Sequence, residues 1–176
     1  MRIELQNTTA IVVDYQERLL PVIAENEKLI QNSEILIRGL RTLGVPLCVT
    51  QQYTKGLGMT APEIQEAVGN KDYLEKISFS SYDAVAEVIQ GKKHVVLCGI
   101  ETHICVLQTV IDLAAHGYVP VLVTDCVSSR KPEDKKAGIK RAMQEGAIVT
   151  TYEAILFELL KEAGTPVSKE IQKLVK

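Results

Sequence analysis

The sequence has few aromatic residues and few histidines. Its 176 residues include no tryptophan, two phenylalanines and three histidines, and no stretch mixes basic with aromatic side chains as nucleic-acid-binding surfaces do. The net charge of -2 at pH 7 gives no attraction to nucleic acids or to acidic membranes. No apolar run approaches the about 20 residues that cross a bilayer, and the N-terminus lacks the layout of a signal peptide. We therefore expect a cytoplasmic protein with no nucleic-acid or membrane partner.

Paired cysteines are also missing. The four cysteines have no CxxC spacing, so the sequence indicates neither a zinc site nor a redox motif. In a reducing compartment we expect four free thiols, most of them buried in strands. They are Cys48, Cys98, Cys105 and Cys126.

Short β-branched apolar runs alternate with longer stretches of helical periodicity. The pattern predicts strands at residues 8–14, 45–51, 72–77, 94–99, 119–125 and 147–151. It predicts helices at about 26–43, 60–69, 82–90, 102–116, 132–145, 153–163 and 168–175. Such alternation is typical of a parallel sheet covered on both faces. We expect one α/β domain over residues 1–176, with a six-stranded, doubly wound sheet in the order 3-2-1-4-5-6.

The longest stretch without periodicity, residues 51–60, follows the second predicted strand. Its place puts it on the side where open α/β sheets bind ligands, although a flexible surface loop is an equally good interpretation. Residues 60–63, with the sequence TAPE, have the form of a capping box in which Thr60 starts the next helix.

Cys105 stands out among the cysteines because it follows the fourth strand at the start of a helix. If Thr102 caps that helix, Cys105 lies in the first turn, where unpaired amides and the helix dipole favour a thiolate. The alternative is a small apolar side chain packed under the sheet, which is the usual role of a cysteine and the one expected for the other three.

A nucleophilic thiol needs a base, and no histidine is well placed to be one. His103 diverges from Cys105 by roughly 200° on a helix, His116 lies about 16 Å along the helix axis, and His94 opens the fourth strand at its far end. We expect all three to be surface or capping residues. Asp14, at the end of the first strand, is the better candidate because strands one and four are neighbours about 4.8 Å apart.

Lys76, at the end of the third strand, is harder to place by geometry. The third strand lies nearly 10 Å from the first, at about two strand spacings, so this lysine needs its own length and an inward loop to reach the same pocket. Most lysines are solvated instead.

Three segments resemble the isochorismatase-like cysteine hydrolases, a superfamily that includes nicotinamidases and N-carbamoylsarcosine amidase. They read VVDYQ (12–16), EKISFSSYD (75–83) and LCGIETHICVLQTVIDLAAHGYVPVLVTDCVSSR (97–130), and the likeness extends over residues from about 8 to 159. The resemblance implies a three-layer α/β/α fold and a catalytic triad of Asp14, Lys76 and Cys105. It also implies a cis peptide between Ile100 and Glu101, with the backbone amides of Glu101 and Cys105 forming an oxyanion hole.

The resemblance implies an activity as well. Family members cleave a small-molecule amide or related C–N bond through a cysteine thioester, and they are usually homo-oligomers. We expect Gln16, Gln51, Tyr53 and Phe79, which flank the triad segments or follow the second strand, to line the substrate pocket. A family member that only binds or assembles is the alternative, and a thiol redox protein is a weaker one.

The sequence departs from the family pattern after the second strand. Nicotinamidases carry an aspartate and histidines there that bind a metal, whereas this chain reads QQYTKGLG, with neither residue type. We therefore expect no metal and no other cofactor, and disfavour nicotinamide as the substrate. True isochorismatases lack the nucleophilic cysteine, so Cys105 argues against their reaction.

Overall fold

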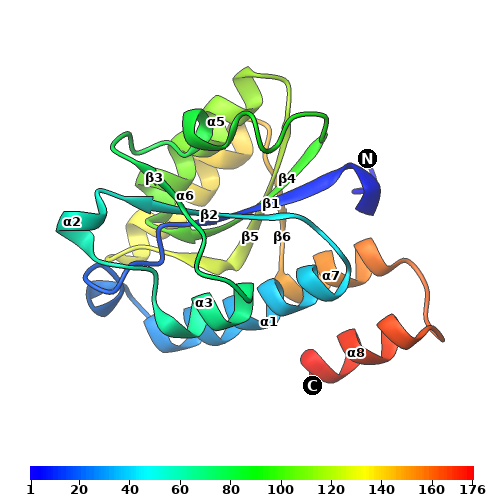
Figure 1. Ribbon diagram of the computed structural model, residues 1–176. Coiled ribbons are helices and arrows are strands. Elements are labelled where there is room, and N and C mark those ends of the chain that lie inside the picture. The colour runs from blue at the N-terminus through cyan, green and yellow to red at the C-terminus, as the bar shows by residue number, and fades with distance from the viewer.

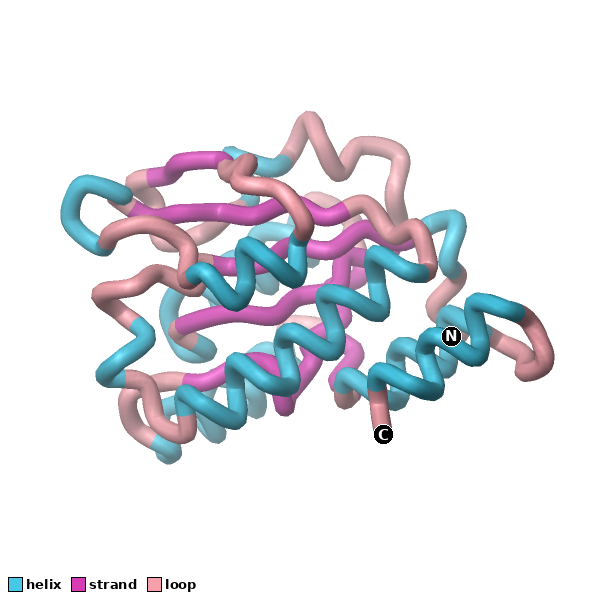
Figure 2. Tube along the Cα trace, turned by 60° about the horizontal axis from the view of Figure 1, so that its bottom comes forward, coloured by secondary structure: helices cyan, strands magenta, loops and turns pink.

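A parallel sheet organises the molecule. The computed structural model describes all residues from 1 to 176, and its six strands lie in the order β3-β2-β1-β4-β5-β6 (Figures 1 and 2). The predicted fold class and strand order are therefore confirmed. The strands are β1 (Thr8–Val13), β2 (Leu47–Gln52), β3 (Leu74–Lys76), β4 (His94–Ile100), β5 (Val119–Ser128) and β6 (Ile148–Thr150).

The two central strands, β1 and β4, are buried at every position. Along β1, Ala10 and Val12 belong to one hydrophobic core, whereas Ile11 and Val13 belong to the other. A strand that is covered on both faces needs apolar side chains in both directions, which explains the unbroken apolar runs of the sequence.

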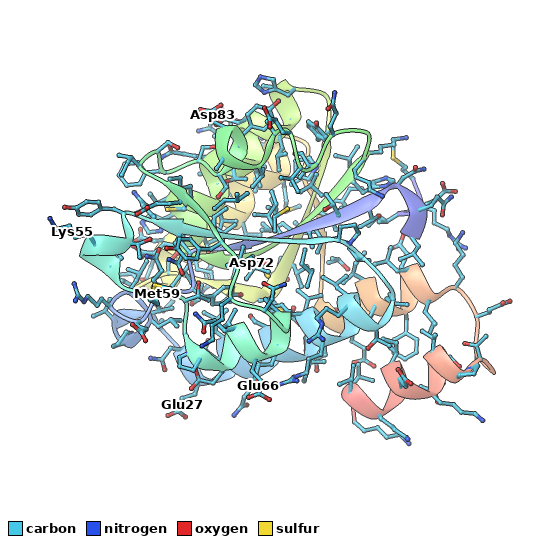
Figure 3. All side chains as sticks on the ribbon, viewed as in Figure 1. Glu27, Lys55, Met59, Glu66, Asp72 and Asp83 are labelled. Atoms are coloured by element: carbon cyan, nitrogen blue, oxygen red, sulfur yellow. The ribbon has the colours of Figure 1, made fainter.

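Helices cover both faces of the sheet. Four of them supply side chains to the core that contains Val12: α1 (Asn26–Thr42), α3 (Pro62–Val68), α7 (Tyr152–Leu160) and α8 (Pro166–Leu174). The opposite core receives α4 (Tyr82–Val85), α5 (Leu107–Ala115) and α6 (Pro132–Gln144) (Figure 1). Their charged side chains point outward, as Glu27, Glu66 and Asp83 do in Figure 3.

Short helical segments complete the chain. Two are 3₁₀ turns, η1 (Leu5–Asn7) and η2 (Leu20–Val22), and α2 (Thr54–Leu57) is a single turn after β2. A five-residue π-helical segment, η3 (Thr102–Val106), connects β4 to α5. No helix is long and apolar enough to cross a membrane.

Gly99 lets the two central strands approach each other at the edge where β1 ends. It pairs with Val13 and has a φ of 138°. A Cβ at this position would overlap the Val13 carbonyl oxygen, so a side chain here would push β4 away from β1.

Several predicted details are wrong. Thr60 does not cap α3, because its hydroxyl donates to the Gln51 side chain and Ala61 is the N-cap residue. The helix expected over 102–116 is π-helical up to Val106, and the one expected over 82–90 keeps regular α geometry only to Val85. His94 is buried with both ring nitrogens unpaired, rather than on the surface.

Candidate active site

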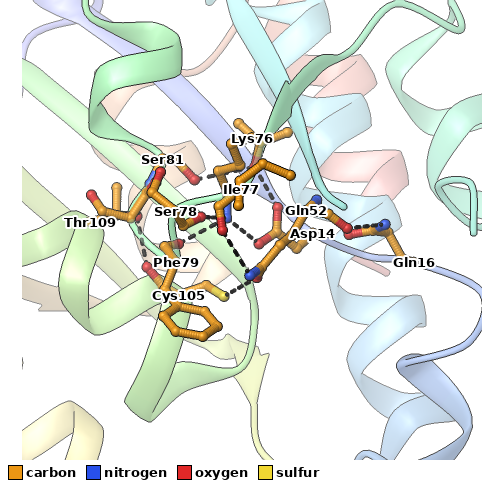
Figure 4. A network of polar contacts seen from close by, with 12 residues as sticks. Asp14, Gln16, Gln52, Lys76, Ile77, Ser78, Phe79, Ser81, Cys105 and Thr109 are labelled. Atoms are coloured by element: carbon orange, nitrogen blue, oxygen red, sulfur yellow. Dashed lines mark hydrogen bonds and ion pairs between the residues drawn. The ribbon is translucent and has the colours of Figure 1, made fainter. Parts of the chain in front are cut away.

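Four neighbouring strands end at one polar cluster. The pairing places Val13 opposite Thr50 and Gly99, and Gln52 opposite Lys76. The carboxyl ends of β1, β2, β3 and β4 therefore share one edge of the sheet, which is where open α/β sheets bind their ligands. Figure 4 shows the side chains that meet there.

Asp14 is turned into this cluster by its backbone. Strict alternation after Val13 would point it to the face of Ala10 and Val12, but its φ of 52° redirects the side chain. Its Oδ1 accepts from the Thr50 hydroxyl at 2.8 Å, and its Oδ2 lies 2.7 Å from Lys76 Nζ. The carboxylate is thus fixed at both oxygens.

Lys76 reaches Asp14 from the edge strand, as its length allows. The Lys76 and Asp14 side chains are 2% and 0% exposed, so this is a buried ion pair in which little water screens the charges. Lys76 Nζ also donates to the carbonyl oxygens of Ser78 at 3.1 Å and Phe79 at 2.8 Å. Its three N–H donors are therefore all occupied.

Cys105 lies in η3 and not in the first turn of an α-helix, so the expected reason for a thiolate is wrong. Burial and the neighbouring charge of Asp14 raise the pKa of Cys105 to about 12, while the cation of Lys76 and a backbone hydrogen bond from Glu101 act against that rise. At neutral pH the resting residue is a thiol.

Gln52 holds the hydrogen of this thiol. The Cys105 thiol donates to Gln52 Oε1 at 3.2 Å, and Gln52 Nε2 donates to the Ile77 carbonyl at 3.3 Å (Figure 4). Asp14 lies close enough for its negative charge to raise the pKa of Cys105. The thiol therefore hydrogen-bonds the neutral Gln52 oxygen and lies within the electrostatic influence of the Asp14 carboxylate.

A pocket of about 150 Å³ opens beside the thiol. Its walls are mostly apolar, and no lysine or arginine contributes to them. The lining residues are Leu19, Gln52, Leu57, Phe79, Glu101, Ile104 and Cys105. A site of this kind suits a small molecule without a net charge.

Of the residues predicted to line the pocket, only Phe79 does so. Gln16 and Gln51 are buried and hydrogen-bond to other segments of the chain. The Gln16 side chain hydrogen-bonds the backbone of Gln52, and Gln51 Oε1 accepts hydrogen bonds from the amide and hydroxyl of Thr60. Tyr53 is 52% exposed outside the pocket. Strand alternation could have found Gln52, because Cys48, Thr50 and Gln52 point the same way along β2.

The turn before Cys105 is held from two sides. The Ile100–Glu101 peptide is cis. The buried Glu101 carboxylate accepts from the backbone and Nε of Arg130, at 3.0 and 3.2 Å. His103 Nδ1 lies 3.0 Å from the Ser129 hydroxyl. No histidine hydrogen-bonds Cys105, and no group of three or more His, Cys, Asp or Glu side chains is arranged to hold a metal ion.

This fold is that of the isochorismatase family. The model of the Isochorismatase domain matches residues 8–154, so the chain belongs to that family. Isochorismatase domain-containing protein 1 of Danio rerio is 38% identical over 167 residues, which cover 93% of this chain and 59% of the relative. The chain thus spans about three fifths of the length of that relative.

Solved structures share the architecture. The MAR1 ribonuclease of Caenorhabditis elegans has a TM-score of 0.95 and 38% identity, and the match covers 99% of this chain and 92% of the other. The YcaC protein of Escherichia coli, described as an octameric hydrolase of unknown specificity, has a TM-score of 0.85 and 21% identity over 92% of this chain and 83% of its own. The second likeness concerns the fold alone.

Proposed function

We propose that this protein is a cysteine hydrolase that cleaves the C–N bond of a small amide. The observation that carries the proposal is the buried 2.7 Å ion pair of Asp14 and Lys76 beside Cys105, whose thiol lines a pocket. A carboxylate base, a cation and a thiol held together in this way are what thioester chemistry requires.

In the first half-reaction, Asp14 takes the thiol proton and the Cys105 sulfur forms a bond to the substrate carbonyl carbon. The π electrons of the carbonyl move onto its oxygen, which we propose is held by the backbone amides of Glu101 and Cys105. The C–N bond then breaks, the nitrogen receives the proton from Asp14, and an amine or ammonia leaves a thioester on Cys105.

In the second half-reaction, Asp14 takes a proton from a water molecule, whose oxygen attacks the thioester carbon. The C–S bond breaks, the sulfur regains a proton, and a carboxylic acid is released. The sum is amide plus water giving acid plus amine, so no cofactor is needed. Lys76 stabilises the anions that form in both steps, because its charge lies next to Asp14.

The pocket limits the size and charge of the substrate. A cavity of about 150 Å³ holds a molecule as large as benzene, and drug-sized ligands need 300 Å³ or more. The apolar walls favour an uncharged acyl group. RNA cleavage, the activity in the name of the Caenorhabditis elegans relative, is less well supported, because phosphate binding needs lysine or arginine at the site and this lining has none.

We also propose a homo-oligomer. Several apolar side chains next to the site are exposed, among them Ile77 at 72%, Phe79 at 50% and Tyr53 at 52%. Exposed apolar side chains that lie together favour association with another protein surface. The same fold forms an octamer in the Escherichia coli protein.

Ammonia release tests the proposed reaction. Purified protein should release ammonia from at least one member of a panel of small neutral amides, and Cys105→Ala should abolish that release. Circular dichroism and the melting temperature of the variant should match those of the wild type, because the thiol sits in a pocket wall. If the wild type and Cys105→Ala released ammonia equally, the mechanism would be wrong. A folded protein that binds amides in calorimetry without turnover would instead indicate a binding protein.

A further inference from the structure

The side-chain amide of Gln52 has a fixed direction. Its Nε2 donates to the Ile77 carbonyl at 3.3 Å, and its Oε1 accepts from the Cys105 thiol at 3.2 Å. Turning the amide over would place two oxygens against each other at Ile77 and would leave the thiol without this acceptor. The oxygen of Gln52 therefore faces the pocket.

The backbone of Gln52 is fixed as firmly as its side chain. The Gln52 amide donates to Gln16 Oε1 at 2.8 Å, and Gln16 Nε2 donates to the carbonyl oxygens of Gln52 at 3.0 Å and Gly58 at 2.8 Å. Gln16 itself is fully buried. Gln52 Oε1 is consequently a preorganised acceptor and not a mobile surface group.

The polar side chains closest to the thiol are acceptors. Lys76 uses all its N–H groups on Asp14, Ser78 and Phe79, so it has none left for a ligand. Asp14 and Gln52 remain, each with an oxygen near Cys105. A ligand that pairs with both acceptors must carry two hydrogens on one atom or on neighbouring atoms, as the NH₂ group of a primary carboxamide does.

We propose that Gln52 Oε1 accepts an N–H of the leaving nitrogen and thereby selects primary carboxamides over esters of the same acyl group. This inference rests on the proposed function. An ester oxygen has no hydrogen to offer, so Gln52 Oε1 keeps the Cys105 thiol as its only partner and gains no hydrogen bond from the substrate. Sites that are built to hydrogen-bond a substrate N–H discriminate strongly against analogues without it.

The same contact starts the reaction. In the free protein the thiol donates its hydrogen to Gln52 Oε1 and not to Asp14. When the substrate N–H takes that acceptor, the thiol hydrogen turns to Asp14, the carboxylate whose charge acts on Cys105. The correct substrate thus prepares its own nucleophile.

The test compares the hydrolysis of propionamide with that of methyl propionate, in the wild type and in Gln52→Met. This substitution keeps the length of the side chain and removes its hydrogen-bond acceptor. Rates are corrected with Cys105→Ala, and the readout is the ratio of kcat/KM for the amide to kcat/KM for the ester. We expect Gln52→Met to lower this ratio about tenfold, since one hydrogen bond is lost to the amide only. Phe79→Leu is the matched control: it changes a wall that both substrates share, so the ratio should stay within about twofold.

A second measurement needs no variant. Wild-type protein should hydrolyse N,N-dimethylpropionamide at least a hundredfold more slowly than propionamide, because neither acceptor finds an N–H. If amide hydrolysis depends on Cys105 and the ratio does not fall in Gln52→Met, or if both amides react equally fast, the role of Gln52 is wrong and the hydrolase stands. If no amide of the ammonia-release panel, propionamide included, is hydrolysed in a Cys105-dependent way, the proposed function fails and this inference fails with it.

Discussion

At the scale of single residues, the four cysteines are distinguished by the residues around them and not by the pKa values of their thiols. Burial raises the pKa of Cys98 to about 12, and burial with the charge of Asp14 raises that of Cys105 to about 12 as well. Cys105 differs from the others because it lines a pocket and also lies under the influence of the buried Asp14–Lys76 ion pair. We therefore expect the reactive cysteine to be the one with a carboxylate base and an ion pair beside it, and not one that is already ionised.

This view predicts an unusual pH profile for alkylation. Because the pKa of Cys105 is about 12, its reaction with iodoacetamide should accelerate about tenfold per pH unit from pH 7 to pH 9.5, without a plateau. Asp14→Asn removes a negative charge that raises this pKa, so more thiolate forms and alkylation should become faster while amide turnover is lost. Mass spectrometry of the Cys105 peptide measures both rates. A plateau near pH 7, or slower alkylation in Asp14→Asn, would contradict the charge assignment.

At the scale of elements, the segment that carries Cys105 depends on close packing against α6. A Cβ at Gly138 of α6 would lie 2.9 Å from His103 Cα and 3.0 Å from His103 N, both of them backbone atoms of η3. Backbone atoms give way less easily than the end of a flexible side chain. Because Gly138 has no side chain, α6 can pack directly against η3, and this contact sets the position of the segment that carries Cys105.

Gly138→Ala should destabilise the protein, although replacing a glycine by alanine within a helix usually stabilises it. In a free helix, alanine instead of glycine stabilises by about 1 kcal/mol. Here the added methyl group must push η3 aside, and overpacking of this kind costs about 1–3 kcal/mol. Urea unfolding should show a net loss of stability, with lower amide turnover because Cys105 moves. Lys140→Ala, an exposed change on the same helix, should stay within about 0.5 kcal/mol of the wild type. Equal or greater stability in Gly138→Ala would refute the packing argument.

The elements also explain how far the sequence could predict the site. The periodicity of apolar residues and the expected strand order were enough to place Asp14 and Cys105 at the ends of neighbouring strands, because the carboxyl ends of parallel strands lie at the same edge of the sheet. They did not foresee η3, since five residues of π-helix leave no mark on a helical apolar pattern. Nor did they identify the role of Gln52, which depends on Gln16 and Ile77 from other segments. Long-range hydrogen bonds of this kind have no local signal.

At the scale of the whole molecule, the two ends of the sheet have different tasks. The carboxyl ends of four strands build the polar site, whereas His94 lies at the opposite end, where β4 begins, paired with Thr8 and Val119. A change at that end can alter stability without touching the pocket. Because the two ends are separate, the effect of pH on stability can be tested at His94 without changing the residues of the site.

Stability should fall in mild acid because of His94. Burial, followed by the nearby charge of Lys93, lowers its pKa below the usual 6.5, while Glu4 and Glu158 oppose the change. The unfolded chain binds this proton more readily than the native protein does, so the stability present above pH 6.5 is lost as the pH falls through the native pKa. One proton accounts for at most about 1.4 kcal/mol per pH unit. Urea unfolding at pH 7.5 and pH 5.5 should show this loss in the wild type and in His116→Gln, but not in His94→Leu. If His94→Leu lost as much stability as the wild type, another group would be responsible.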